Sequence, residues 1–378
     1  MEQLAVLFEN IQGLVLNFGE SWKSLVMLLI GGVLIFLAIR FKMEPTLLLP
    51  IGLGTILVNL NFTGEFIEGS ALGPITTLYN AGIANELFPL LLFIGIGAMI
   101  DFGPVLSNPK LMIFGAAAQF GIFFTLCTAS IFFPNVRDAA SIAIIGAADG
   151  PTAISVANIL GTEYGGAITV AAYSYMALVP IIQPPVIKLL TTKNERRIRM
   201  PYREASVSKT TRILFPIIIT ILAGLFVPAA SALVGFLMFG NLIRECGVLD
   251  SLSNTAQNAL ANIITIFLGI SIALQMQADR FLRWETILIL CLGLVAFIFD
   301  TAGGVLFAKL LNLFLKEKMN PMIGAAGISA FPMSGRIVHK LGLEEDKQNF
   351  LLMHAMGVNV SGQIASVIAG GLILGFFG

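Results

Sequence analysis

A series of long apolar segments most constrains what this chain can fold into. Nine stretches reach or approach the roughly 20 residues that a helix needs to cross a bilayer. Hydrophobic residues make up 57% of the 378 residues and charged residues only 12%, about half the charged share of an average soluble domain. The sequence therefore predicts an all-α, polytopic membrane protein. The stretches are 25–39, 46–60, 87–100, 111–133, 168–190, 213–243, 263–276, 286–315 and 351–377.

The charge balance and the cysteines exclude several classes of function. The 22 basic and 22 acidic residues cancel, so no overall field favours nucleic acid. Cys127, Cys246 and Cys291 are scattered through apolar sequence and predict neither a disulfide framework nor a zinc site. The phosphate-binding pattern Gly-x-x-x-x-Gly-Lys does not occur, which argues against ATP as the driver. The first residues lack the basic region of a cleaved signal peptide, so we expect none.

The distribution of Lys and Arg predicts which loops face the cytoplasm. The segment 193–212 is the densest basic loop, so we expect it inside, whereas the acidic connection 61–86 carries no base and suits the outside. Counted from these two loops, the segment around Asp149 cannot cross the membrane completely without breaking the alternation of sides. We therefore expect it to enter and leave on one side. By the same count, Arg280 and Arg283 would lie outside, against the rule that Lys and Arg gather in cytoplasmic loops.

Two parts of the chain share a plan. Residues 92–100 align with 266–274, and the Ile-Gly-Ala-Ala of 145–148 recurs at 323–326 with nearly the same separation. Each repeat also has a stretch rich in Gly, Pro and Ser, as expected of a broken helix whose freed backbone is covered by protein or by a water-filled cavity. We expect an inverted-repeat, transporter-like bundle in which two discontinuous or re-entrant elements meet at mid-membrane. The two stretches are 138–160 and 321–341.

The repeat divides the chain into five expected parts. The repeats are separated by the basic loop and by connecting helices that contain a Pro in their middle. The parts are N-terminal membrane helices at 1–84, a first repeat at 85–191, a basic cytoplasmic loop at 192–212, connecting helices at 213–260 and a second repeat at 261–378.

Asp149 is the first candidate functional residue, because an ionisable group inside a membrane is costly and is a functional hypothesis by default. It is followed by Gly150 and Pro151, which break a helix and free carbonyl oxygens. Carboxylate, hydroxyl and carbonyl oxygens are the ligands that hard cations take. The alternative is a structural Asp that caps the following helix, since Asp before Gly-Pro is also an ordinary helix start. The apolar flanks favour the ion site.

A second polar cluster occupies 320–336. Ser and Asn in such a segment otherwise serve as packing contacts between membrane helices. Arg336 either serves the site or snorkels to a cytoplasmic surface. The other members of the cluster are Asn320, Gly324, Ser329 and Ser334.

Two further candidates lie in the last long helix of each repeat. Tyr175 and Asn359 occupy equivalent places in the two repeats. A tyrosine in a membrane protein is otherwise an interfacial anchor. Asn359, Ser361 and Gln363 place three polar side chains within five residues, which is more than helix packing usually requires.

These residues resemble the beta subunits of the sodium-pumping, biotin-dependent decarboxylases, whose members act on oxaloacetate, methylmalonyl-CoA or glutaconyl-CoA. The resemblance covers essentially the whole chain, and the motif at 146–154 is specific. It implies a subunit of a bacterial or archaeal cytoplasmic membrane that decarboxylates carboxybiotin, consumes a proton and moves Na+ outward. The site residues it implies are Asp149, Tyr175, Asn320, Gly324, Ser329, Arg336 and Asn359.

The resemblance also implies roles and partners. Asp149, Tyr175 and Arg336 would be catalytic, Arg336 would bind carboxybiotin, and Na+ would be held by Asp149 with Asn320, Gly324, Ser329 and Asn359. A biotin carrier protein would present carboxybiotin, with no covalent cofactor on this chain. Further partners would be a carboxyltransferase alpha subunit, a small membrane-anchor subunit and other copies of this chain. The alternative is a secondary ion or carboxylate transporter without chemistry, in which Asp149 is the coupling carboxylate.

Overall fold

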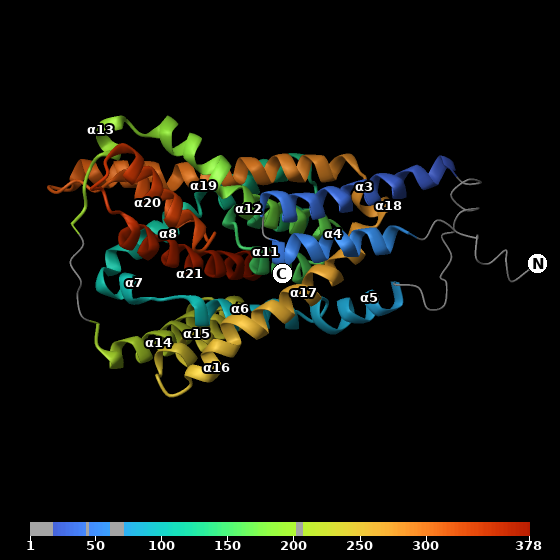
Figure 1. The fold of residues 1–378 in the computed structure, drawn as a ribbon, viewed down its shortest axis with the longest axis horizontal. Helices are drawn as coiled ribbons and strands as arrows, with labels where there is room; N and C mark the ends of the chain where they lie inside the picture. The colour runs from blue at the N-terminus through green and yellow to red at the C-terminus, as the bar shows by residue number, and fades with distance from the viewer. Residues whose placement is uncertain (1–17, 43–44, 61–71, 202–206) are drawn as a thin grey trace, which may run out of the picture.

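The structure is a computed structural model that describes residues 18–42, 45–60, 72–201 and 207–378 (Figure 1). Regular structure in these ranges is entirely helical. Six helices are long and apolar enough to cross a membrane, or up to eight if each of two bent pairs is one span. The prediction of an all-α, polytopic membrane protein is therefore confirmed. Before the first repeat lie α3 (Phe18–Phe41), α4 (Pro45–Asn59), α5 (Leu72–Leu78) and the π-helical turn η1 (Tyr79–Ile83).

The two predicted repeats, 85–191 and 261–378, contain nine and seven helical segments. The first consists of α6 (Leu87–Met99), α7 (Gly103–Ser107), η2 (Pro109–Leu111), α8 (Met112–Ala118), α9 (Phe120–Phe132), α10 (Val136–Ala143), η3 (Ile144–Ala147), α11 (Gly150–Ile159) and α12 (Gly165–Leu190). The second consists of α17 (Ala261–Ile272), η6 (Ala273–Met276), α18 (Ala278–Phe281), α19 (Trp284–Phe314), η7 (Pro321–Gly327), α20 (Met333–Glu345) and α21 (Leu352–Phe377). Between them lie α13 (Lys193–Arg196), α14 (Lys209–Phe226), η4 (Pro228–Ala230), α15 (Ser231–Glu245), α16 (Asp250–Thr255) and η5 (Ala256–Leu260).

The repeats pack reciprocally. The α12 helix of the first repeat contacts α19 and α20 of the second, and α21 of the second contacts α8 and α11 of the first. The 3-10 segment η3 contacts α19, while η7 contacts α8. Each half therefore covers the broken element of the other, as expected of an inverted repeat.

Both broken elements are hairpins that return to the side they left. In the first, the hydroxyl of Thr162 donates to the carboxylate of Asp138 at 2.6 Å, which joins its end to its start. In the second, both ends contact Arg196, because the amide of Asn320 donates to its carbonyl oxygen at 2.8 Å and Glu345 forms an ion pair with its side chain at 2.6 Å. The predicted re-entrant elements are confirmed.

The tips of the two hairpins meet in the buried interior. The backbone N–H of Ser329 donates to the carbonyl oxygen of Ala147 at 3.1 Å. A backbone bond between two interrupted helices satisfies groups that an apolar environment would otherwise leave unpaired.

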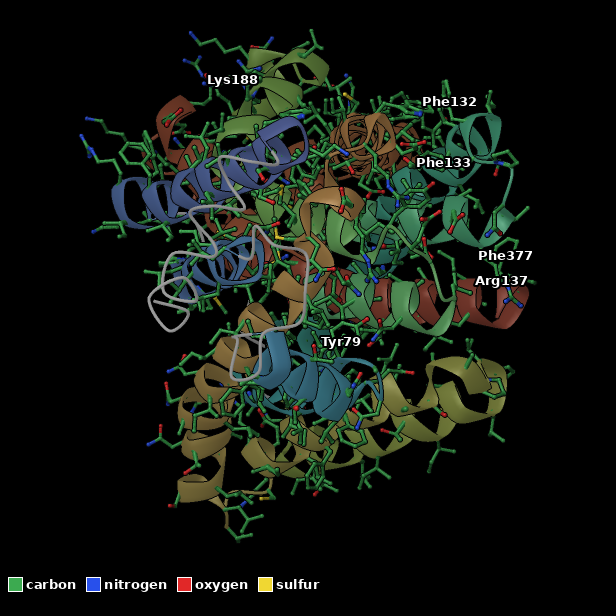
Figure 2. All side chains as sticks on the ribbon, turned by 90° about the vertical axis from the view of Figure 1, so that its right-hand side faces the viewer. Tyr79, Phe132, Phe133, Arg137, Lys188 and Phe377 are labelled. Carbon is green, nitrogen blue, oxygen red and sulfur yellow. The ribbon has the colours of Figure 1, made fainter. Side chains whose placement is uncertain are left out.

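Polar contacts at the surface hold the outer elements. Arg283 is one of the two arginines expected outside against the charge rule. It forms an ion pair with the carboxylate of Glu163 at 2.6 Å. Arg137 at the start of α10 donates from Nε to the carbonyl oxygen of Phe377 at the end of α21, at 3.1 Å (Figure 2). The α14 and α15 helices pack on each other along the lower edge in Figure 1.

Candidate functional site

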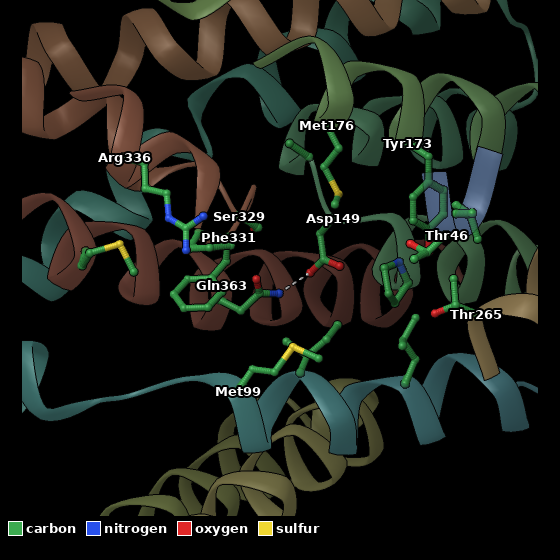
Figure 3. A pocket seen from close by; sticks show the side chains of 17 residues that line it. Thr46, Met99, Asp149, Tyr173, Met176, Thr265, Ser329, Phe331, Arg336 and Gln363 are labelled. Atoms are coloured by element: carbon green, nitrogen blue, oxygen red, sulfur yellow. Dashed lines mark hydrogen bonds between the residues drawn. The ribbon is translucent and has the colours of Figure 1, made fainter. Parts of the chain in front are cut away.

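A cavity of about 490 Å³ lies where the two repeats meet the flanking helices (Figure 3). Most of the side chains that line it are apolar, but the carboxylate of Asp149 and the guanidinium of Arg336 line it as well. Its lining residues are Thr46, Leu47, Leu92, Ile96, Met99, Ala148, Asp149, Pro151, Tyr173, Met176, Thr265, Ser329, Phe331, Pro332, Arg336, Met356 and Gln363.

The local sequence places Asp149 at a break in the chain. The 3-10 segment η3 is followed by its C-cap Ala148, which has a left-handed conformation (φ 52°, ψ 41°), and Asp149 itself is extended. Pro151 follows in the first turn of α11, where a missing N–H costs nothing. The Asp149 side chain accepts from the N–H of Thr152 at 3.4 Å. Asp149 therefore does cap α11, as the structural alternative expected. The cap involves only one of its two carboxylate oxygens, Oδ1.

The second carboxylate oxygen of Asp149 is held by donors from both repeats. Its Oδ2 accepts from the hydroxyl of Thr152 at 2.8 Å, the amide of Gln363 at 3.0 Å and the hydroxyl of Ser366 at 2.8 Å. The side chain is only 3% exposed. With the N–H of Thr152, these donors give the carboxylate four hydrogen bonds, while none of the ion pairs among the described residues involves Asp149. Hydroxyl and amide groups also carry acceptor oxygens, so the same side chains can turn those oxygens toward a cation.

Arg336 lies on α20 at an exposed part of the cavity wall. Figure 3 shows the side chain of Gln363 between it and Asp149. Within the described ranges, none of the ion pairs involves Arg336. Its guanidinium is therefore available to a carboxylate that enters the cavity, which favours a role in the site over simple snorkelling.

The second break contributes Ser329 and Asn359. The hydroxyl of Ser329 donates to the carbonyl oxygen of Gly362 at 3.2 Å, and Ser329 lines the cavity. Asn359 donates from Nδ2 to the carbonyl oxygen of Ile328 at 2.7 Å. Its Oδ1 is buried and has no hydrogen-bond partner among the described residues. That oxygen is a candidate ligand, although Asn359 does not line the cavity wall.

Three more predicted site residues lie away from the cavity wall, as Asn359 does. Asn320 caps η7 and donates to the carbonyl oxygens of Arg196 and Ile198, so it fixes the basic loop to the second break. Gly324 packs on α19, where an added Cβ would lie 2.0 Å from the carbonyl oxygen of Gly304. The hydroxyl of Tyr175 donates to the carbonyl oxygen of Leu290. Their predicted roles in Na+ binding and proton transfer stay predictions.

The structure adds two side chains, Tyr173 and Ser366, to the predicted site. Tyr173 lines the cavity, and its ring covers Gly150 so closely that an added Cβ there would lie 2.0 Å from Cζ of the ring. Ser366 contacts Asp149 directly. Its spacing of three residues from Gln363 on α21 puts both side chains on one helix face, and that spacing was the available signal.

Comparison with known proteins gives a consistent result. The family model for the Na+-transporting oxaloacetate decarboxylase beta subunit matches residues 23–377. The methylmalonyl-CoA decarboxylase subunit beta of Propionigenium modestum is 49% identical, over 96% of each chain. The glutaconyl-CoA decarboxylase subunit beta of Acidaminococcus fermentans is 49% identical, over 95% of this chain and 94% of its own. A probable oxaloacetate decarboxylase beta chain of Vibrio cholerae is 46% identical, over 97% and 99%.

Proposed function

This chain belongs to the family of Na+-transporting decarboxylase beta subunits, and from that premise we propose that its cavity couples decarboxylation of carboxybiotin to Na+ movement. Membership makes the chain a multi-pass membrane subunit of a biotin-dependent decarboxylase that transports Na+. It does not favour the secondary transporter without chemistry. The observation that carries the proposal is that Asp149 and Arg336 line one cavity.

Asp149 is the proposed Na+ ligand. Oδ1 accepts only a long bond of 3.4 Å, so it is the carboxylate oxygen best able to take a cation. Thr152 and Ser366 would then turn their hydroxyl oxygens from the carboxylate to the ion. Binding of Na+ would therefore exchange one set of contacts for another, without leaving a buried charge unpaired at either stage. Asn359 and Ser329 on the second break are further proposed ligands, while Asn320 and Gly324 support that break.

Arg336 is the proposed binding residue for the carboxylate of carboxybiotin. A planar guanidinium binds a carboxylate with two parallel hydrogen bonds and so fixes its orientation. The bond between the carboxyl carbon and the ureido nitrogen then breaks, CO2 leaves, and the electron pair stays on the nitrogen. That nitrogen takes up a proton, which completes the step.

Tyr175 is the proposed source of that proton. A cation near a phenol favours its charged form, so arrival of Na+ would promote release of the proton. The Tyr175 hydroxyl donates to the carbonyl oxygen of Leu290, on α19. Its role therefore requires that the phenol reach the cavity during turnover.

The partners follow from the chemistry. The chain is a beta subunit, so we propose a biotin carrier that presents carboxybiotin at the Arg336 end, a carboxyltransferase alpha subunit that loads it, a small membrane-anchor subunit and further copies of this chain. The similar beta subunits belong to decarboxylases of three different substrates. We therefore propose that the carboxyltransferase, and not this chain, selects the substrate. No covalent cofactor is proposed on this chain.

The test is decarboxylation of free carboxybiotin by the protein purified with its native partners, with and without Na+. We expect Na+ to stimulate the reaction. The Arg336→Lys variant should raise the KM for carboxybiotin about tenfold, because a point charge does not reproduce the planar fork. If Na+ did not stimulate the wild-type protein, the proposed coupling would be contradicted. If the Lys variant had the wild-type KM, Arg336 would be assigned to snorkelling.

A further inference from the structure

A buried amide on α12 holds the second break. Gln183 is fully buried and donates from Nε2 to the carbonyl oxygen of Ala325 at 2.7 Å and to the hydroxyl of Ser334 at 2.8 Å. The Ser334 hydroxyl lies 3.0 Å from Oε1 of Gln183 and 3.1 Å from the same Ala325 oxygen. Gln183 thus connects the first repeat to both η7 and the first turn of α20.

The reason for this contact lies in the inverted repeat. Alignment of 145–148 with 323–326 makes Ala147 equivalent to Ala325 and Pro151 equivalent to Ser329. The Ala147 carbonyl oxygen accepts from the N–H of Ser329. The equivalent bond to Ala325 would need an N–H at position 151, and proline has none. The Ala325 oxygen would be orphaned in an apolar interior, at a cost of about 1–3 kcal/mol.

Gln183 and Ser334 replace the missing backbone donor. Their side chains supply the Ala325 oxygen with hydrogen bonds from two different helices. Because side chains take the place of a fixed backbone bond, this half of the interface depends on residues outside both breaks.

The pair lies beside one wall of the cavity. Ser334 stands two residues before Arg336 on α20, and Phe331 and Pro332 line the cavity immediately before it. A shift of Ser334 would therefore move the guanidinium relative to Asp149. The carboxylate itself has its own donors on α11 and α21, which Gln183 does not contact.

We infer that Gln183 is a positioning residue that holds Arg336 in place for the carboxylate of carboxybiotin. This inference rests on the proposed function of Arg336. It predicts that loss of Gln183 affects carboxybiotin binding selectively and leaves Na+ binding at Asp149 unchanged.

The experiment uses Gln183→Met, which keeps the approximate shape and removes the amide, in the complex purified with its native partners. The KM for free carboxybiotin should rise roughly tenfold, the effect of losing a hydrogen bond to a buried group. The Na+ concentration for half-maximal rate should change less than about twofold, since the Asp149 donors are intact. A general loss of packing would instead raise both quantities and lower the unfolding temperature.

Two further variants sharpen the result. Ser334→Ala should raise the same KM, and the double variant should cost less than the sum of the single ones, because both act on the Ala325 oxygen. Gln119→Met is the matched control, since this buried amide, the C-cap of α8, donates among the described residues to the Gly115 carbonyl oxygen of that helix; it should leave the KM unchanged.

The outcomes separate the inference from the proposal it rests on. If Arg336→Lys raises the KM but Gln183→Met does not, Gln183 is not a positioning residue and Arg336 keeps its role. If neither variant raises the KM, the proposed role of Arg336 fails as well. Additive effects of Gln183→Met and Ser334→Ala would also overturn the inference.

Discussion

Asp149 and Asp300 are the two buried carboxylates among the described residues, and the structure holds them in different ways. Asp149 caps its own helix and lines the cavity. Asp300, fully buried in the middle of α19, accepts from the N–H of Gly121 at 2.5 Å, just after the break between α8 and α9. It therefore caps the start of a neighbouring helix and does not line the cavity wall.

The second oxygen of Asp300 makes the contrast sharper. Its Oδ2 has no hydrogen-bond partner within the described ranges and lies against η3, where a Cβ added at Gly146 would approach it to 2.6 Å. The same oxygen of Asp149 has three donors, two of them hydroxyls. Burial alone therefore does not identify a coupling carboxylate. Contact with a cavity and donors that can become ligands distinguish Asp149, the proposed coupling carboxylate, from Asp300.

The largest expected effect is that of Asp149→Asn. The amide keeps the shape but removes the charge, and a loss of about 3 kcal/mol of ion binding lowers Na+-dependent turnover about a hundredfold. Na+ uptake into liposomes that contain the complex is the measurement, with membrane insertion followed in parallel. Asp300→Asn is the control and should keep Na+ uptake. Normal uptake by the Asp149 variant would remove the basis of the comparison.

Asp300→Ala tests the structural side. Loss of a cap on α9 should lower the free energy of unfolding by about 2 kcal/mol, whereas Asp300→Asn retains an acceptor for Gly121 and should cost less. Unfolding of the purified protein in detergent gives both values. For the folded fraction of either Asp300 variant, the Na+ concentration for half-maximal rate should equal that of the wild type. A large rise in that concentration would place Asp300 in the ion path and end the distinction.

Ser366→Ala probes the donors that Asp149 has and Asp300 lacks. Removal of one hydroxyl from Oδ2 should raise the Na+ concentration for half-maximal rate about tenfold, because Thr152 and Gln363 remain. Ser361→Ala is the matched control on the same helix, since its hydroxyl donates to the carbonyl oxygens of Leu111 on η2 and Val358 on α21 and to neither oxygen of Asp149. Equal effects of the two variants would mean that the hydroxyl on Asp149 has no special role.

Tyr175→Phe has the smallest expected effect. Decarboxylation should fall about fivefold, the effect of one hydrogen bond of about 1 kcal/mol, and its response to pH and Na+ should change together if the phenol carries the proton. Rates against pH at low and saturating Na+ are the measurement. Profiles that coincide with the wild type at both Na+ levels would exclude Tyr175 as proton carrier. Tyr173, which lines the cavity, would then be the phenol to test.

Much of the fold could be predicted because its signals are local. Length and apolarity predicted nine stretches, where the described residues contain six helices able to span a membrane, or up to eight spans with the bent pairs; Gly and Pro at 146–151 predicted the first break. The short Ile-Gly-Ala-Ala match was enough to pair the two breaks, whose tips are joined by Ser329 and Ala147.

The rest of the site depends on tertiary contacts. Nothing near Asp149 in the sequence indicates that Ser366 donates to it, because the two are 217 residues apart. Asp300 could have been noticed as an acid inside the apolar stretch 286–315, but no Gly-Pro break follows it and its partner is a backbone N–H of another helix. Asn320 was expected at the ion, and only the structure shows that its amide holds the basic loop.

The origin of the Asp149 donors has a consequence for biogenesis. Gln363 is 214 residues after Asp149, so at a synthesis rate of about 5–20 residues per second its codon is translated roughly 10–40 s later. During that interval the nascent first hairpin has only the Thr152 donors for its carboxylate. The proposed ion site would thus be complete only after α21 has inserted, and a ribosome-bound or truncated chain would offer Na+ no finished route by which to dissipate the membrane gradient.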